Sequence, residues 1–349
     1  MATRKEEKQF EKEMKAAKIA KKKAIKASGI KPDLSPEERR YNRNRAMSSA
    51  IWPIFRFFIL FGLCFIILYP LIFMISTAFR PNEQMSDPSI IWIPKSLTLD
   101  NIKQTAEVMN YGTTIFNTVK LNIIASLLSV VSCALTGYGF ARFKFKGKGI
   151  LFAIVVLMII VPPQITSIPL FLQFSYFKGF GLVKLFTGKA TISLINNSVT
   201  MYAPALFANG IKAGLFIFIF RQFFRGLPKE LEDAAYLDGC GPLRTFVKVM
   251  APNAASSFLT VFLFSIVWYW NDYYVSTSFF TNNETMALTL KILDRTLQAQ
   301  LFENKTVSPR QLVVWMQSGC LLSITPILVL YTFLQRYFIE GVSRSGLVG

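Results

Sequence analysis

The chain contains no histidine, and this absence excludes several kinds of chemistry. Histidine general bases, histidine-ligated metals and the histidine-dependent membrane acyltransferases all require that side chain. The sequence also has no G-x-S-x-G nucleophile turn, no H-x-x-x-x-D motif, and no cluster of acid, base and nucleophile. We therefore expect no catalytic residues, no metal site and no cofactor site in this chain.

Two further features are scarce. A phosphate-binding loop of the form G-x-x-x-x-G-K-[ST] is absent, so the chain cannot bind ATP in that way. There are only four cysteines, and none belongs to a C-x-x-C pair. We interpret them as small apolar side chains rather than as metal ligands or disulfide partners: Cys64, Cys133, Cys240 and Cys320.

What the chain has in abundance is apolar sequence. Hydrophobic residues make up 52% of the 349 residues, and the mean hydropathy is +0.39. Such a composition is typical of a polytopic membrane protein. A bilayer core needs about 20 apolar residues per helix, and runs of this length are too long for barrel strands. The sequence thus predicts an all-α integral membrane protein with six transmembrane helices, at 52–79, 116–140, 150–173, 199–220, 254–274 and 312–334.

The distribution of charge orients these helices. The formal net charge is +19. Residues 1–50 carry 15 basic residues against seven acidic ones, and residues 141–149 carry four basic residues and no acid. The loop at 80–115 has three basic residues and four acidic ones. Because lysine and arginine collect on the cytoplasmic side, we expect a cytoplasmic N-terminus, and six crossings return the C-terminus to the same side.

The chain divides into a basic cytoplasmic arm, residues 1–50, and a transmembrane domain, residues 51–349. We interpret the arm as a segment attracted to anionic membrane lipid, with specific docking as the alternative. Its basic residues are not interleaved with a series of stacking aromatics, so we do not expect nucleic acid as a partner.

The third apolar run contains V-P-P-Q-I-T-S-I-P, which includes Pro162, Pro163 and Gln164. Proline distorts a helix and frees backbone carbonyls. A broken helix at membrane depth is tolerated only against protein or a water-lined cavity. The segment is either a kink required by packing or part of a transport pathway.

The fifth apolar run ends in W-Y-W-N-D-Y-Y, which includes Trp268, Trp270, Asn271 and Asp272. Tryptophan and tyrosine are common at membrane interfaces, and that alone explains the rings. It does not explain the amide and the carboxylate, because polar groups near the membrane core usually face a cavity. Aromatic faces beside such groups also bind sugars. An interfacial belt and a pathway both remain open.

A short polar insert, residues 228–253, lies between the fourth and fifth runs, on the expected cytoplasmic side. Pro228 suits the first turn of a helix, and three acidic residues follow where the helix dipole is positive. Gly239 and Gly241 permit a sharp turn, and a second short helix should stop before Pro252. The insert is either a stiff helix-turn-helix that contacts a soluble partner or an ordinary amphipathic interfacial loop.

The string D-A-A-Y-L-D-G-C-G-P-L-R-T-F-V-K-V-M-A-P resembles the EAA loop of bacterial ABC-importer permeases. That pattern runs E-A-A, two variable residues, D-G, and an apolar run closing at L-P. Asp233 stands where glutamate is usual, and Ala251 where leucine is usual. Further strings look like the carbohydrate-uptake branch, similar to the maltose-type permeases: F-R-Q-F-F-R-G-L-P-K-E, Y-P-L-I-F-M-I-S-T-A-F-R-P-N-E-Q, G-Y-G-F-A-R-F-K-F-K-G-K-G, W-N-D and Q-R-Y-F-I-E-G. The resemblance covers about residues 55–345.

This resemblance implies the ABC type I importer permease fold in a bacterial cytoplasmic membrane. It implies a second, related permease, two ATPase subunits that bind ATP and magnesium, and an extracellular solute-binding protein. The residues expected to couple this chain to the ATPase are Glu232, Asp233, Ala234, Ala235, Asp238, Gly239, Phe246 and Pro252. The residues expected along the substrate pathway are Trp268, Trp270, Asn271, Asp272, Pro162, Pro163 and Gln164.

The function expected from these features is the ATP-driven import of a sugar or oligosaccharide by a subunit that is not itself an enzyme. Two alternatives are an ABC permease for a non-sugar solute, such as a peptide, amino acid or inorganic ion, and a non-transport membrane enzyme or scaffold. Anionic solutes would favour converging cations, and the apolar runs contain few. Lys120, in the second run, has no explanation at this level.

Overall fold

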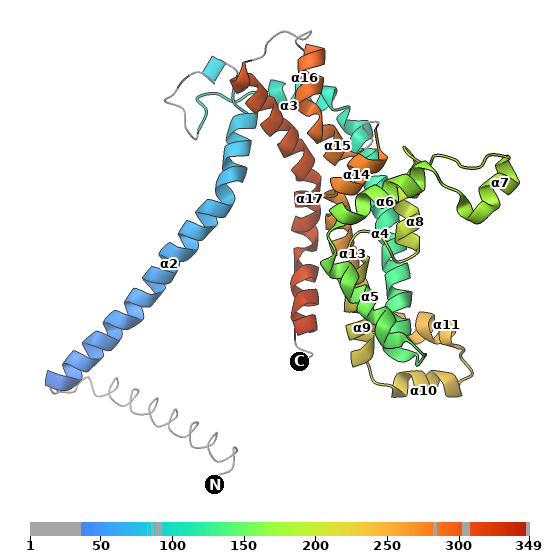
Figure 1. Ribbon diagram of the computed structural model, residues 1–349. Helices are drawn as coiled ribbons and strands as arrows, with labels where there is room; N and C mark the ends of the chain where they lie inside the picture. The colour runs from blue at the N-terminus through green and yellow to red at the C-terminus, as the bar shows by residue number, and fades with distance from the viewer. Residues whose placement is uncertain are drawn as a thin grey trace. The chain divides into compact units, whose positions relative to one another are not determined.

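The computed structural model describes residues 36–81, 83, 84, 87, 93–281, 285–301 and 308–346. Over these residues the secondary structure is helical, apart from one isolated antiparallel bridge between Phe177 and Ile192. The prediction of an all-α protein is confirmed for this part of the chain. The chain splits into two compact units, residues 1–70 and 71–349 (Figure 1). Residues 1–35 of the expected arm lie outside the described residues.

Three of the described helices are long, α2, α4 and α17, with 43, 32 and 38 residues, and the others are shorter. Their bounds are α2 Pro36–Ala78, α3 Asp100–Val108, α4 Tyr111–Arg142, α5 Lys148–Ile160, α6 Pro163–Ser175, the 3₁₀ turn η2 Gly179–Gly181, α7 Leu182–Thr187, α8 Val199–Leu206, α9 Ala213–Gly226, α10 Glu230–Leu237, α11 Pro242–Thr245, the π-helical turn η3 Phe246–Met250, α12 Ala251–Asn253, α13 Ala255–Trp270, α14 Tyr274–Phe279, α15 Met286–Lys291, α16 Leu293–Leu301 and α17 Pro309–Gly346.

Helix α2 supplies the described part of the first unit and crosses into the second. It is continuous from Pro36, so the arm boundary expected at residue 50 falls inside a helix. Its stretch Trp52–Ala78 is long and apolar enough to cross a membrane. Large apolar side chains along this stretch are exposed, among them Phe58 at 65% and Ile66 at 70%. This surface is suited to lipid or to another apolar helix.

Among the described residues, three helices could span a membrane, and five segments could if each of two bent pairs counts as one span. The three are Trp52–Ala78, Tyr111–Arg142 and Pro309–Arg336, at the expected positions. The third predicted run is the first bent pair, in which α5 and α6 meet at 104° across Pro162. The fifth run is α13, which meets the preceding segment Pro242–Asn253 at 82°. Six crossings are therefore not established by helix length.

The fourth predicted helix, 199–220, is wrong as a continuous helix. The chain forms α8 and α9 with a break between them. In the break, Ala208 and Lys212 adopt left-handed backbone conformations with φ angles of 53° and 59°. Gly210 lies in the break, and a Cβ there would be 2.5 Å from the Tyr269 hydroxyl. The Ser132 hydroxyl donates to the Ala205 carbonyl at 2.6 Å near the end of α8. Side-chain partners from α4 and α13 thus replace helical hydrogen bonds.

The second helix of the polar insert also differs from the prediction. It does not stop before Pro252 but continues through α12 to Asn253, and the break falls at Ala254. The π-helical turn Phe246–Met250 directly precedes it. Because a π-turn widens the helix, the missing N–H and the ring of Pro252 are accommodated.

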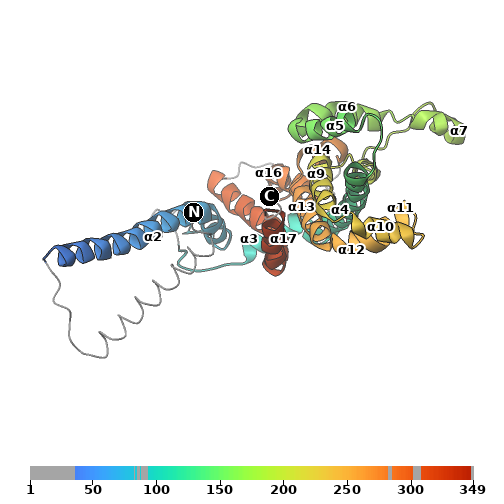
Figure 2. The same cartoon turned by 90° about the horizontal axis from the view of Figure 1, so that it is seen from below.

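The core of the second unit is built around α9. Figure 2 shows α9 between α5 on one side and α4 on the other. Glycines allow both close approaches: a Cβ on Gly137 of α4 would lie 2.6 Å from the Cβ of Phe220, and one on Gly214 of α9 would lie 2.9 Å from the Val155 carbonyl. Phe216, Phe220 and Phe224 of α9 are fully buried at this contact.

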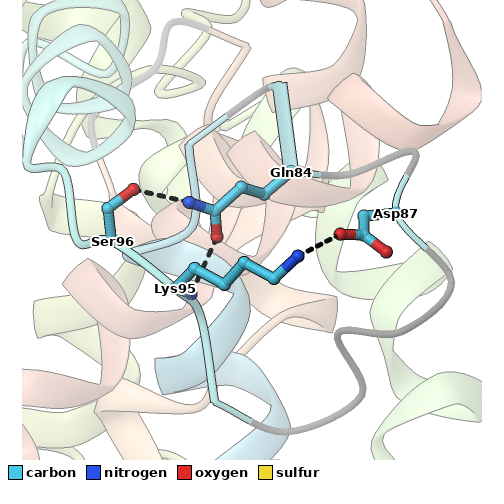
Figure 3. A network of polar contacts seen from close by, with 4 residues as sticks. All are labelled: Gln84, Asp87, Lys95 and Ser96. Atoms are coloured by element: carbon cyan, nitrogen blue, oxygen red, sulfur yellow. Dashed lines mark hydrogen bonds and ion pairs between the residues drawn. The ribbon is translucent and has the colours of Figure 1, made fainter.

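The connection from α2 to α3 is closed by polar contacts. Figure 3 shows Gln84, whose amide donates to the Ser96 hydroxyl and accepts from the Lys95 backbone, while the Lys95 ammonium pairs with Asp87 at 2.6 Å. Buried Asn101 of α3 donates to the carbonyls of Ala78 and Arg80. Asn101 thereby fixes α3 to the end of α2.

Replacing Gly137 with alanine is expected to destabilise the second unit, because the new methyl group would meet Phe220 and the backbone nitrogen of Arg221 at 3.0 Å. Overpacking of this kind costs about 1–3 kcal/mol. The midpoint of thermal unfolding of the purified chain in detergent should fall by about 2 °C or more.

Gly139→Ala is the matched control, since its methyl group would meet only a Phe143 ring atom at 3.9 Å. It should leave the midpoint unchanged or raise it slightly, because alanine favours helix. Equal midpoints for the two variants would contradict tight packing of α4 on α9.

Candidate functional site

The polar insert forms a helix-turn-helix at one end of the second unit, with α10 and α11 side by side there (Figure 1). Helix α10 follows Pro228 and carries Glu230, Glu232 and Asp233 in its first turn, as predicted. The turn is made by Gly239, whose φ of 76° favours glycine. Its N–H and that of Cys240 satisfy the last carbonyls of α10. The insert is therefore an ordered element.

A buried ion pair fixes α10 to the transmembrane core. The Glu232 carboxylate lies 3.4 Å from the guanidinium of Arg142, the last residue of α4, and each side chain is less than 10% exposed. A second nitrogen of Arg142 donates to the Leu227 carbonyl at 2.6 Å, just after α9. One side chain at the end of α4 thus holds both the link that leaves α9 and the helix that follows.

The inward face of the insert is apolar. Ala235 and Phe246 are buried, and the Phe246 ring packs against Tyr138 and Phe224, with centroids 5.1 and 5.9 Å apart. Tyr138 of α4 also lies close to Glu232. Both halves of the insert therefore rest on the same part of α4 and α9.

The outward face has a different composition. Asp233, Ala234, Asp238, Gly239 and Pro252, all expected coupling residues, are exposed. They share this face with apolar side chains that sequence reasoning missed, at 89%, 67% and 58% exposure: Leu237, Leu243 and Val247. Exposed apolar residues on a stiff polar element are typical of a protein interface.

A second feature is a cavity of about 300 Å³ at the break between α8 and α9, within the size range of small-molecule sites. Polar side chains from the break and from neighbouring helices line it: Thr200, Asn209, Lys212, Tyr269 and Asp272. Two expected pathway residues, Pro163 and Asp272, are among the lining residues. Pro162, Gln164, Trp268, Trp270 and Asn271 are not.

Those five residues lie outside the cavity lining and make other contacts. Trp268 is half-exposed and stacks under the Lys212 ammonium, which lies 4.5 Å from the ring centroid. Trp270 is buried and donates to the Ser323 carbonyl of α17. The Asn271 amide donates to the carbonyl of Val267, on its own helix. Pro162 and Gln164 are exposed at the bend between α5 and α6.

Asp272 has a structural role that sequence reasoning did not identify. Its carboxylate accepts from the backbone N–H and hydroxyl of Ser276, at 2.7 and 3.0 Å, and from the Val275 N–H at 3.3 Å. These bonds satisfy the free N–H groups at the start of α14. The carboxylate therefore both stabilises a helix and adds polarity to the cavity.

Bent and broken helices around a cavity, with a stiff polar helix pair at one end, have the build of the membrane subunit of a transporter. The comparison with protein families agrees: residues 133–344 match the family described as "Binding-protein-dependent transport system inner membrane component". The chain belongs to this family, and it is a multi-pass protein of the bacterial cytoplasmic membrane.

Individual relatives are permeases of sugar transport systems. The chain is 30% identical over 290 residues, 82% of this chain and 93% of the relative, to the "Arabinooligosaccharides transport system permease protein AraQ" of Halalkalibacterium halodurans. It is 26% identical over 282 residues (81% and 93%) to the "Trehalose transport system permease protein SugB" of Mycobacterium tuberculosis. It is 24% identical over 306 residues (87% and 99%) to the "Diacetylchitobiose uptake system permease protein DasC" of Streptomyces coelicolor.

A solved structure shares the fold. It is a crystal structure of a bacterial ABC transporter involved in the import of the acidic polysaccharide alginate. The match covers 88% of this chain and 100% of that one, with a TM-score of 0.59 and 18% identity. The resemblance to ABC-importer permeases is confirmed, and a membrane enzyme or assembly scaffold is not supported.

Glu232→Gln is expected to loosen the insert, because it leaves the buried Arg142 guanidinium without a carboxylate. Breaking one side of a buried pair costs about 3 kcal/mol or more. Limited proteolysis of the purified chain should then cut between α9 and α12 faster than in the wild type. Glu230→Gln, on the exposed side of the same helix, is the control and should not change the rate.

A double variant separates the pair from its surroundings. Arg142→Met combined with Glu232→Leu removes both charges, so it should be cut more slowly than Glu232→Gln alone. Unchanged cleavage in Glu232→Gln would mean that the pair does not hold the insert.

Proposed function

We propose that this chain is the permease subunit that carries a sugar or oligosaccharide through an ATP-driven importer. The observation that carries the proposal is the insert: its inner face is locked to α4 and α9, and its outer face exposes Leu237 and Leu243. Family membership and the sugar systems of the relatives support the rest. A non-sugar solute is the alternative, because the relatives' substrates are properties of those proteins.

The energy comes from a partner. Two ATPase subunits, which bind ATP and magnesium, dock on this outer face and on that of a second, related permease. Leu237 and Leu243 fill apolar depressions of the ATPase, and Asp233 and Asp238 add polar contacts around them. Because Arg142 ties α10 to the end of α4, a displacement of the insert moves α4 and the packed α9 with it. An extracellular solute-binding protein delivers the sugar.

The proposed topology has six crossings with both termini in the cytoplasm. Five crossings are the five apolar segments, and the sixth is the broken α8–α9 segment. The backbone groups freed by its break are tolerated because protein surrounds them. The end of α17 lies at the same end of the second unit as α10, in support of a cytoplasmic C-terminus (Figure 1).

The proposed pathway runs past the cavity at the α8–α9 break. Lys212 and Asn209 offer hydrogen bonds to hydroxyl groups, and the Trp268 ring offers a face for a sugar ring. Pro162, Pro163 and Gln164 shape the neighbouring bend. An ionisable side chain at such a break is typical of a substrate route. The second permease supplies the opposite wall.

Leu237→Asp is expected to abolish sugar uptake while leaving the chain folded, because this side chain is 89% exposed. A charge placed in an apolar contact should release the ATPase. The measurement is uptake of labelled sugars, from monosaccharides to arabino- and glucooligosaccharides, together with the ATPase recovered with the tagged permease.

Leu185→Asp is the matched control, since Leu185 is 75% exposed on α7, outside the insert. It should keep the ATPase. A wild type that recovers no ATPase and takes up none of the sugars would overturn the proposed function, and normal uptake in Leu237→Asp would overturn the docking face.

Lys212→Gln is expected to raise the KM for sugar uptake by up to about tenfold, since one hydrogen bond is worth about 0.5–1.5 kcal/mol. ATPase recovery should be unchanged, because Lys212 precedes α9 and the insert follows the other end of that helix. Lys184→Gln, an exposed lysine of α7, is the control. An unchanged KM would place the sugar elsewhere.

A further inference from the structure

A groove of about 620 Å³ lies between the start of α5 and the insert, and its lining is strongly basic. The cations come from three separate segments: the end of α4 with the turn that follows, the first residue of α5, and the end of α9 with the link that follows. They are Arg142, Lys144, Lys148, Arg225 and Lys229. Two carboxylates, Glu232 and Asp233, also line it.

These cations are poorly neutralised by the chain itself. Arg142 forms an ion pair with the Glu232 carboxylate. Within the described part of the chain, the other four cations have no carboxylate within 4 Å. The Lys148 ammonium is instead repelled by the positive charges of Arg221, Arg225 and Lys144. Packing like charges this closely is unfavourable unless an anion joins them.

The surroundings indicate what kind of anion fits. Helix α5 begins at the groove and presents a row of exposed apolar side chains, Ile150, Leu151, Ile154 and Leu157, at 72%, 48%, 50% and 55%. Nearby, the Arg221 guanidinium lies over the Phe152 ring at 3.9 Å. A free phosphate would use only the cations. A molecule with an anionic head and apolar chains would use both the groove and the surface of α5.

We propose that this groove binds the phosphate headgroup of an anionic phospholipid, with its acyl chains along α5. A basic pocket at the cytoplasmic end of membrane helices is suited to that ligand. The cytoplasmic position of the groove rests on the proposed function. The headgroup bridges the turn after α4 and the link between α9 and α10, so the bound lipid braces the base of the insert.

The test is native mass spectrometry of the whole transporter complex, purified in detergent and titrated with phosphatidylglycerol or phosphatidylcholine. The wild type should bind phosphatidylglycerol in preference. Lys144→Gln combined with Arg225→Gln should weaken that binding by roughly tenfold or more, because each basic residue near an anionic surface contributes to the attraction. The control Lys178→Gln with Lys184→Gln removes the same charge from exposed positions around α7 and should change nothing.

Other results would overturn the proposal. Equal phosphatidylglycerol binding by the wild type and the groove variant places the lipid elsewhere. Displacement of phosphatidylglycerol by millimolar inorganic phosphate indicates a site for free phosphate. Loss of the ATPase from the groove variant in lipid-free detergent, with unchanged lipid binding, assigns the groove to an acidic segment of that partner.

A second measurement uses the unaltered protein and does not depend on a variant that folds. Photoactivatable phosphatidylglycerol should form adducts on α5 between Ile150 and Leu157, and adducts confined to other helices would contradict the proposal. Both measurements read lipid binding, not transport. A complex that binds lipid in this way but imports no sugar would disprove the proposed function and leave the lipid site standing.

Discussion

The ion pair between Arg142 and Glu232 is the interaction on which the position of the insert depends. Without it, α10 would be held by its short link and by the apolar packing of the insert at Ala235 and Phe246. Two desolvated charges are expensive to bury, and removing either partner leaves the other charge buried and unpaired. The pair makes the insert a rigid extension of α4. Gly137 lets α9 pack directly against α4 as well, so the insert, α4 and α9 form one packed group.

The second unit combines this rigid part with a region in which the helices are broken or bent. The break between α8 and α9, the bend at Pro162 and the cap of α14 at Asp272 all lie around one cavity. At the break, the hydroxyls of Ser132 and Tyr269 bond backbone groups that a continuous helix would satisfy, and the Asp272 carboxylate does the same at the start of α14. A membrane protein can bear such irregularity only where its own side chains supply the partners.

Much of this could be read from the sequence. Apolar runs predicted α2, α4, α13 and α17, because hydropathy and length decide whether a helix spans a membrane. The insert was predicted from its first-turn acidic residues and its glycine turn, and the coupling residues taken from the family pattern stay a prediction. The break within 199–220 could not be predicted, because it depends on Gly210 meeting Tyr269 from a distant helix. The role of Arg142 was equally hidden: a basic residue at the end of an apolar run is ordinary until the fold places Glu232 beside it.

Leu237 and Leu243 also bear on how such a transporter is assembled in the cell. In the proposed transporter, the insert presents these exposed leucines to the cytosol until an ATPase subunit covers them. Such a surface attracts chaperones, proteases and other copies of the chain. A cell that makes this subunit in excess would lose the surplus by degradation or aggregation. Under the proposed docking, the amount of permease that survives is set by the supply of the ATPase, so the exposed leucines would also control the stoichiometry of the transporter.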